Sequence, residues 1–214
     1  MARFRHLHEI FRTYGRKYEI DSLLLAAQGY QESKLNQALR SAAGAVGIMQ
    51  VIPCYAAGPI NISNVGTEAT ANIHAGAKML RHKVDRYFHD AAVDALDAVL
   101  FALASYNAGP NRIVGLRKRA ASQGLNPNVW FENVELVAAQ AIGQETVNYV
   151  RDVYKYYVAY KLSEKHTGSV EPAASQGDTA TVRGILSADS TFLSQAVDDE
   201  HRSLERIGHS SSIS

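Results

Sequence analysis

The sequence predicts an all-α protein. Apolar residues recur at spacings of three and four over several long stretches, which is the pattern of amphipathic helices. No segment shows the sustained alternation of apolar and polar residues that indicates a half-buried strand. The 214 residues are 46% apolar and 20% charged, which suffices for one sizeable core. We expect one compact domain, residues 1–162, followed by a flexible polar tail, residues 163–214.

The first two helices are predicted on either side of Asp21. Before it, the aromatic and aliphatic positions of residues 4–18 fall on one side of an amphipathic helix. Asp21 is a typical N-terminal cap for the helix that follows. That second helix is apolar on almost every face over residues 23–27, which predicts a position in the middle of the domain. Glu32 lies in its last turn.

The rest of the chain alternates between loops and helices. Residues 34–67 are rich in glycine, proline and small polar residues, which predicts a loop region. A Gly-Pro pair at 109–110 marks the end of one helix and the start of another. Further helices are expected over residues 70–88, 96–106 and 110–116. The chain is again expected to be helical after Trp130, most clearly over residues 145–158, and one short helix is expected in the tail around residues 191–207.

Composition excludes several classes of function. The formal charge of +1 gives no long-range attraction to polyanions, so we do not expect nucleic acid as a partner. Cys54 is the single cysteine, which excludes an internal disulfide and a set of thiolate ligands. We interpret it as a small buried hydrophobic residue, with a reactive thiol as the alternative. Neither histidines nor acidic residues have the spacing of a metal site, so we expect no metal and no cofactor.

Two kinds of membrane-related segment are also not expected. No apolar run approaches the ~20 residues that span a bilayer. The charged amino terminus lacks the continuous apolar core of a secretory signal peptide. The sequence therefore predicts neither a transmembrane segment nor a signal peptide.

Glu32 is the candidate catalytic residue. It ends a helix whose preceding residues are apolar on every face, and burial of a carboxylic acid raises its pKa by disfavouring the charged form. A carboxyl group that stays protonated near neutral pH can donate a proton in catalysis. Taken alone, Glu32 is more commonly interpreted as a solvated residue at a helix end. The glycine-rich loop after it, which lets backbone groups approach a ligand, favours the functional interpretation.

Four motifs resemble those of the soluble lytic transglycosylase family. They are Glu32-Ser33, residues 41–50 (SAAGAVGIMQ), residues 104–109 (ASYNAG) and residues 144–150 (QETVNYV). Each motif alone is weak, whereas four in the family's order and with family-like spacing are specific. The resemblance covers residues 4–160 and implies a lysozyme-like helical fold related to goose-type lysozyme.

The resemblance implies cleavage of the β-1,4 bond between N-acetylmuramic acid and N-acetylglucosamine in peptidoglycan. The family cleaves this bond without water and leaves a 1,6-anhydromuramoyl end. Glu32 would be the single catalytic acid and then the base. The other matched positions would bind the sugars or support the site: Ser41, Met49 and Gln50 along the groove, Tyr106 orienting or modulating Glu32, Asn107 beside it, and Glu145 and Tyr149 in the last motif.

A single acid suits this reaction better than ordinary hydrolysis. Most glycosidases flank the scissile bond with two carboxylates, and this chain has one in a convincing setting. Two alternatives remain open at this point. One is a lysozyme-type muramidase, which uses water, and the other is a non-catalytic module that binds peptidoglycan.

Partners and location also follow from the resemblance. It implies binding to peptidoglycan glycan strands, and an envelope-spanning machine is a further candidate partner. Because the family's substrate lies outside the cytoplasm, a periplasmic or cell-envelope location is expected, although no export signal is readable in this chain. We expect a monomer.

Overall fold

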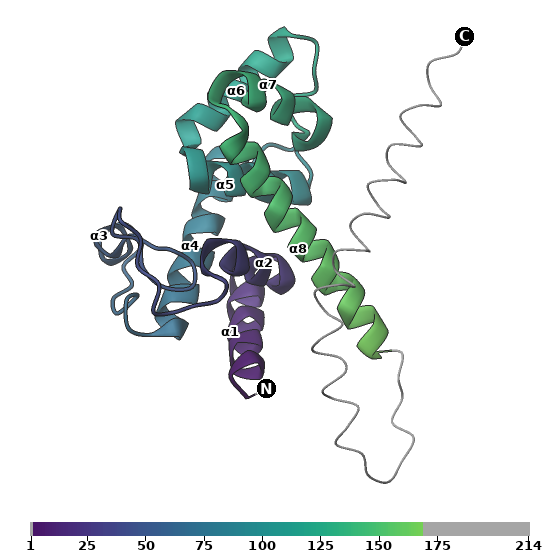
Figure 1. The fold of residues 1–214 in the computed structure, drawn as a ribbon. Helices are drawn as coiled ribbons and strands as arrows, with labels where there is room; N and C mark the ends of the chain where they lie inside the picture. Colours follow the sequence, from purple (N-terminus) through teal and green to yellow (C-terminus); the bar gives the residue numbers. More distant parts are fainter. Residues whose placement is uncertain (1, 169–214) are drawn as a thin grey trace. The chain divides into compact units, whose positions relative to one another are not determined.

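The structure is a computed structural model that describes residues 2–168, with the side chains of residues 6–164. The described residues form helices joined by loops, without a strand, and the all-α prediction is confirmed (Figure 1). Two isolated antiparallel bridges, Arg40 with Val46 and Val46 with Val51, occur in the loop after the second helix. The helix predicted around residues 191–207 lies outside the described residues, and the predicted domain boundary at residue 162 stays a prediction.

The predicted helices are present, with two differences. A short helix, α3, lies inside the predicted loop region, and Gly143 at φ 83° interrupts the helical stretch after Trp130. In chain order the elements are α1 (Ala2–Tyr18), α2 (Ser22–Ser33), α3 (Pro53–Ala57), α4 (Ala69–Tyr87), α5 (Ala95–Ala108), α6 (Pro110–Ser122), the irregular turn η1 (Trp130–Val134), α7 (Glu135–Ile142) and α8 (Gln144–Gly168).

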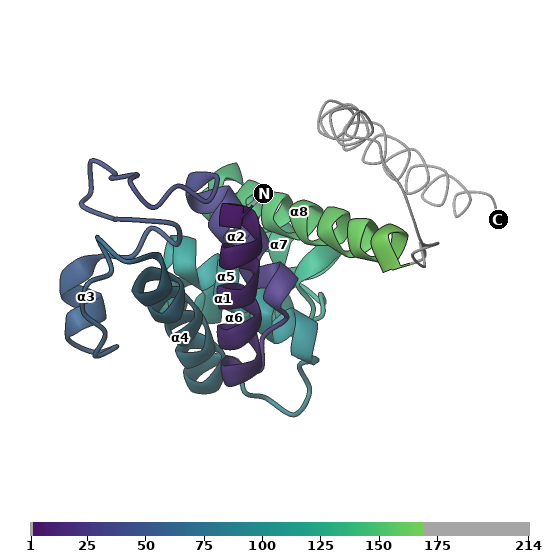
Figure 2. The ribbon, with the colours of Figure 1, turned by 90° about the horizontal axis from the view of Figure 1, so that it is seen from below.

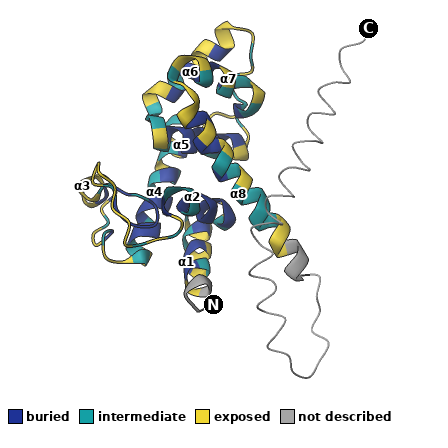
Figure 3. Ribbon diagram, in the orientation of Figure 1, coloured by how far each residue is buried: buried dark blue, intermediate teal, exposed yellow. Residues whose placement is uncertain are grey.

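Helix α2 is the buried helix that its composition predicts. The side chain of Asp21 caps its first turn by accepting a hydrogen bond from the backbone N–H of Leu23 at 2.9 Å. Lys34 ends the helix in the left-handed conformation. Every residue over 23–29 is buried, and Figure 3 shows α2 in dark blue over this stretch. The helix therefore carries Glu32 out of the core at its last turn.

The helices pack on one another within the unit formed by residues 1–160. Helix α1 packs on α2 and α4, and α5 packs on α4 and α6 (Figures 1 and 2). Two aromatic contacts join α8 to the rest, because the ring of Tyr156 lies 4.7 Å from that of Tyr30 and Tyr154 lies 5.0 Å from Phe131. The carboxyl ends of α2 and α5 meet the first turns of α8, because Glu32 contacts Tyr149 and Asn107 contacts Thr146.

Cys54 differs from its interpretation in the sequence. Its side chain is exposed, so the interpretation as a buried hydrophobic residue is wrong. Cys54 lies on the short helix α3, and Ala56 occupies the buried position of that helix. A helix of one turn and a half can bury only a narrow face, which leaves Cys54 toward solvent.

Candidate active site

Glu32 lies at the carboxyl end of α2 with its side chain partly buried. Its Oε1 accepts a hydrogen bond from the hydroxyl of Tyr149 at 2.6 Å, which joins α2 to α8. Burial raises the pKa of Glu32 to about 7, and the hydrogen bond from Tyr149 acts in the opposite direction. Near neutral pH the carboxyl group can therefore be either protonated or ionised.

Two tyrosine hydroxyls lie near this carboxyl group. Burial, and then the charge of Glu32, raise the pKa of both Tyr149 and Tyr106 well above the ordinary value, so both stay protonated donors. Tyr149 donates to Glu32, whereas Tyr106 donates to the backbone oxygen of Met49 at 2.8 Å. Tyr106 thus lies close enough to respond to the charge of Glu32 while its hydroxyl holds the loop.

The loop bearing Met49 and Gln50 packs directly on α4. The side chain of Met49 is fully buried against Gly76, where an added Cβ would lie 2.7 Å from Met49 Cβ and Cγ. Gln50 is partly exposed, and its Nε2 donates to the backbone oxygen of Gly47 at 2.8 Å. Met49 therefore supports the site through its buried side chain and backbone, and of the two residues Gln50 is the one that reaches solvent.

Asn72 on α4, which the sequence analysis did not single out, fixes this loop. Its buried Oδ1 accepts a hydrogen bond from the backbone N–H of Met49 at 2.7 Å. Its Nδ2 donates to the backbone oxygens of Val46 and Val65, each at 2.8 Å. Gly47, at φ 77°, approaches so closely that an added Cβ would lie 2.3 Å from Asn72 Nδ2. In the sequence, the signal that could have identified Asn72 is a polar residue at a position on the buried side of a helix.

Replacing Asn72 with Ala is expected to lower the free energy of unfolding by about 2 kcal/mol, because the buried N–H of Met49 loses its partner and the backbone oxygens of Val46 and Val65 each lose one of two donors. Urea unfolding followed by circular dichroism measures this change. Asn111→Ala, on the exposed side of α6, is the matched control and should change stability by less than about 0.5 kcal/mol. Equal stability of the two variants would contradict the role given to Asn72.

Asn107 is the next residue after Tyr106 and is exposed. Its Oδ1 accepts a hydrogen bond from the hydroxyl of Thr146 at 2.7 Å. Thr146 is buried in the first turn of α8, three positions before Tyr149. The contact places Asn107 one helical turn of α8 from the residue that bonds Glu32. Thr146 falls within a matched motif, although the sequence analysis gave it no role.

Ser41 and Glu145 are both exposed. Ser41 closes its loop, because its Oγ accepts from the N–H of Ala45 at 3.0 Å and its own N–H donates to the oxygen of Ala45 at 2.9 Å. Glu145 lies in the first turn of α8. Among the described residues, no hydrogen bond or ion pair joins either side chain to Glu32, and their roles in substrate binding stay predictions.

Gln28 is a further polar residue that the sequence analysis missed. It lies one turn before Glu32 on α2 and is fully buried. Within the described part of the chain, neither atom of its amide makes a hydrogen bond of ordinary geometry. The amide nevertheless acts to lower the pKa of Tyr149, against the larger effect of burial, so it lies close to that hydroxyl. A buried amide thus lies one helical turn before Glu32, next to the apolar stretch 23–27.

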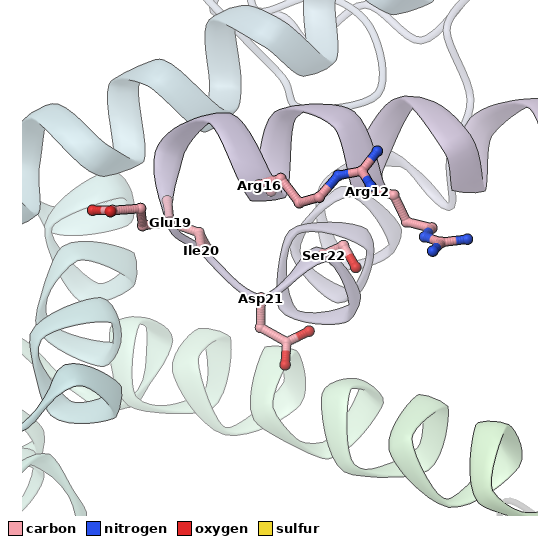
Figure 4. Close-up of a pocket in the computed structure, with 7 residues that line it drawn as sticks. Arg12, Arg16, Glu19, Ile20, Asp21 and Ser22 are labelled. Atoms are coloured by element: carbon pink, nitrogen blue, oxygen red, sulfur yellow. The ribbon is translucent and has the colours of Figure 1, made fainter.

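A cavity of about 350 Å³ lies at the opposite end of α2 (Figure 4). Its position separates it from the carboxyl group, because ten residues of helix between Ser22 and Glu32 span about 15 Å. The carboxylate of Asp21 at its edge is already used as the helix cap. We assign this cavity no part in the chemistry at Glu32. Its lining residues are Arg12, Gly15, Arg16, Glu19, Ile20, Asp21 and Ser22.

The arrangement can carry out general acid and base chemistry with one carboxyl group. Among the described residues, burial and Tyr149 account for the pKa of Glu32. A second carboxylate within about 5 Å would raise that pKa by charge repulsion, and none contributes. The pKa of Glu32 lies near neutral pH, which suits a residue that donates and later accepts a proton.

Comparison with known proteins agrees with the fold and with the motifs. The model of the family described as "Transglycosylase SLT domain" matches residues 9–128. The lytic transglycosylase Slt of Pseudomonas aeruginosa, whose structure was solved as an inactive Glu-to-Gln mutant, superposes with a TM-score of 0.56 at 22% identity. That match covers 73% of this chain and 24% of Slt. The fold is the all-α, lysozyme-like fold of lytic transglycosylases.

Two curated relatives are both named membrane-bound lytic murein transglycosylase F. The protein of Pseudomonas fluorescens (strain Pf0-1) is 32% identical over 160 residues, which is 69% of this chain and 32% of the relative. The protein of Shewanella sp. (strain ANA-3) is 32% identical over 209 residues, 88% of this chain and 42% of the relative. The chain thus spans less than half the length of these relatives. Among the described helices, none combines the length and apolar character needed to cross a membrane.

The family match includes more than half of the chain, and it contains Glu32, the loop of Met49 and Gln50, and Tyr106. The chain therefore belongs to the transglycosylase SLT domain family.

Proposed function

We propose that this chain is a peptidoglycan lytic transglycosylase that cleaves the β-1,4 bond between N-acetylmuramic acid and N-acetylglucosamine and leaves a 1,6-anhydromuramoyl product. Family membership and two relatives named as murein transglycosylases support the class of substrate. The observation that carries the mechanism is the single partly buried carboxyl group of Glu32, with its pKa raised to about 7.

The reaction divides into two proton transfers at Glu32. Protonated Glu32 gives its proton to the glycosidic oxygen as the bond from that oxygen to the anomeric carbon breaks. The acetamido oxygen of the substrate stabilises the positive charge that develops at the anomeric carbon. The C6 hydroxyl of the same sugar then forms the new bond to this carbon, and ionised Glu32 takes its proton. No water is consumed, and Glu32 ends protonated as it began.

The residues around Glu32 support both halves of this cycle. The hydroxyl of Tyr149 stabilises the ionised form after the first step, while burial keeps the protonated form accessible for the next. Tyr106 fixes the loop that carries Met49 and Gln50 beside the carboxyl group. Gln50 and Asn107, both open to solvent, are proposed to contact the sugars, and Ser41, Glu145 and Met49 to bind or support the substrate.

Product analysis distinguishes this proposal from its alternatives. Purified murein is digested with the wild-type protein and with Glu32→Gln, and the products are identified by mass spectrometry. The transglycosylase predicts anhydro-ended muropeptides from wild type. A lysozyme-type muramidase would give products one water heavier, and a binding module would retain murein without releasing soluble products.

Replacing Tyr106 with Phe is expected to lower kcat roughly 5-fold, because the loss of one hydrogen bond, about 1 kcal/mol, loosens the loop at Met49. The ring still fills its place, so the free energy of unfolding should fall by only about 1 kcal/mol. Tyr87→Phe, on α4, is the control and should match wild type in murein digestion. Full activity of Tyr106→Phe would remove this hydroxyl from the catalytic set.

The proposed substrate also sets the expected location and partners. Peptidoglycan lies in the bacterial envelope, so we propose that the protein acts in the periplasm or at the cell envelope as a monomer. A larger envelope-spanning machine that needs an opening in the wall is a compatible partner.

A further inference from the structure

The junction of α5 and α8 contains a hydrogen bond between two side chains that come from different motifs. The hydroxyl of Thr146 donates to Asn107 Oδ1 at 2.7 Å. Thr146 is only 4% exposed, whereas Asn107 is open to solvent. The hydroxyl reaches another helix, and the contact ties the residue after Tyr106 to the turn before Tyr149.

This contact determines which way the amide of Asn107 faces. An asparagine side chain has one oxygen that accepts hydrogen bonds and one nitrogen that donates two. Because the oxygen faces the buried hydroxyl of Thr146, the nitrogen is directed away from it. Among the described residues, no group accepts a hydrogen bond from this nitrogen. The structure thus offers an oriented donor to solvent, held one turn of α8 from the tyrosine that bonds Glu32.

We propose that Thr146 is a positioning residue that fixes the amide of Asn107 so that its N–H donates to an acceptor oxygen of the bound glycan. The inference rests on the proposed function for the identity of the ligand. The carbonyl of an N-acetyl group suits such a donor, because it accepts hydrogen bonds and cannot donate them. If the amide turned over, its oxygen would face that carbonyl, and two acceptors would oppose each other.

The isosteric pair Thr146→Val and Thr146→Ser separates the hydroxyl from the shape of the side chain. Thr146→Val is expected to raise KM for murein fragments about 5- to 10-fold, the effect of one hydrogen bond, with kcat changed less than about 2-fold. Thr146→Ser keeps the hydroxyl and should return KM to within about 2-fold of wild type. Thermal unfolding monitors whether either variant alters the fold. Wild-type KM in Thr146→Val would overturn the proposal.

A double-mutant cycle tests whether Thr146 acts through Asn107. In an Asn107→Ala background, Thr146→Val should cause no further rise in KM, since the amide it positions is gone. An undiminished effect in this background would show that Thr146 acts by another route and would overturn the proposal.

Binding measurements keep this inference distinct from the proposed reaction. Sedimentation with murein, using proteins that also carry Glu32→Gln, measures affinity without cleavage. Thr146→Val should weaken this binding about 5- to 10-fold relative to Glu32→Gln alone. If wild type makes no anhydro product but this difference in binding is found, the proposed reaction fails and the positioning role stands. If wild type makes anhydro product and the difference is missing, the positioning role fails alone.

Discussion

Glu32→Gln is expected to lower the rate of murein cleavage by at least about 10²- to 10⁴-fold, the range typical of a general acid or base. The carboxamide can neither protonate the glycosidic oxygen nor take the proton of the C6 hydroxyl, so both steps lose their catalyst. Its oxygen can still accept the hydrogen bond that Tyr149 donates to Glu32 at 2.6 Å, which preserves the local structure. Release of soluble muropeptides from purified murein measures the effect.

The matched control for this prediction is Glu68→Gln, which removes an exposed carboxylate at the start of α4. It should cleave murein at the wild-type rate. Residual activity of Glu32→Gln within about 10-fold of wild type would mean that another group supplies the proton, and the single-carboxylate mechanism would be abandoned. Because binding does not require the proton, Glu32→Gln should still sediment with murein.

Local signals in the sequence predicted the long helices, but not the short helix α3 or the break at Gly143. Asp21 caps α2 as expected. Residues 23–27, which are apolar on every face of the helix, correctly indicated a buried helix. The loop after α2 was harder, because its shape depends on a distant residue. Asn72 binds the backbone of Met49 and Val46, more than twenty positions away, and no local pattern encodes that contact.

In the candidate site too, the sequence identified the residues, and only the structure shows which of them contact one another. The motifs brought Glu32, Tyr106 and Tyr149 into one set, and the structure places the two tyrosine hydroxyls near one carboxyl group. Sequence reasoning gave the orienting role to Tyr106, whereas in the structure Tyr149 donates to Glu32 and Tyr106 donates to Met49. Two phenols have the same chemistry, so only the three-dimensional arrangement can assign their partners.

Polar residues buried behind the site were the hardest to anticipate. Gln28 resembles any glutamine on a helix until its complete burial beside Tyr149 is known. Thr146 lies in a helix start where threonine is common, and its bond to Asn107 spans two helices that are far apart in the sequence. Gln28 lies outside the four motifs, and Thr146 lies within one of them at a position to which the sequence analysis gave no role. Patterns of spacing along the chain therefore cannot distinguish them from surface positions.

The raised pKa of Glu32 also makes the folded state sensitive to pH. The pKa is about 7 in the folded protein, compared with 4.5 for an ordinary glutamate, so between these values the folded state binds more protons than the unfolded state. The stability that this group contributes is therefore fully present below pH 4.5 and is lost as the pH rises through 7. At about 1.4 kcal/mol per pH unit, the complete loss is about 3 kcal/mol.

Glu32→Gln is accordingly expected to be more stable than wild type at pH 8 and equally stable at pH 4.5. The gain at pH 8 should be about 3 kcal/mol, because the neutral amide has no charged form to bury. Urea unfolding at both pH values measures it, with Glu68→Gln as the exposed control that should follow wild type. A stability difference independent of pH would show that Glu32 does not titrate in the folded protein near neutrality. Its catalytic use depends on that titration, since a carboxyl group that costs no stability when ionised would remain ionised at pH 7 and could not donate a proton.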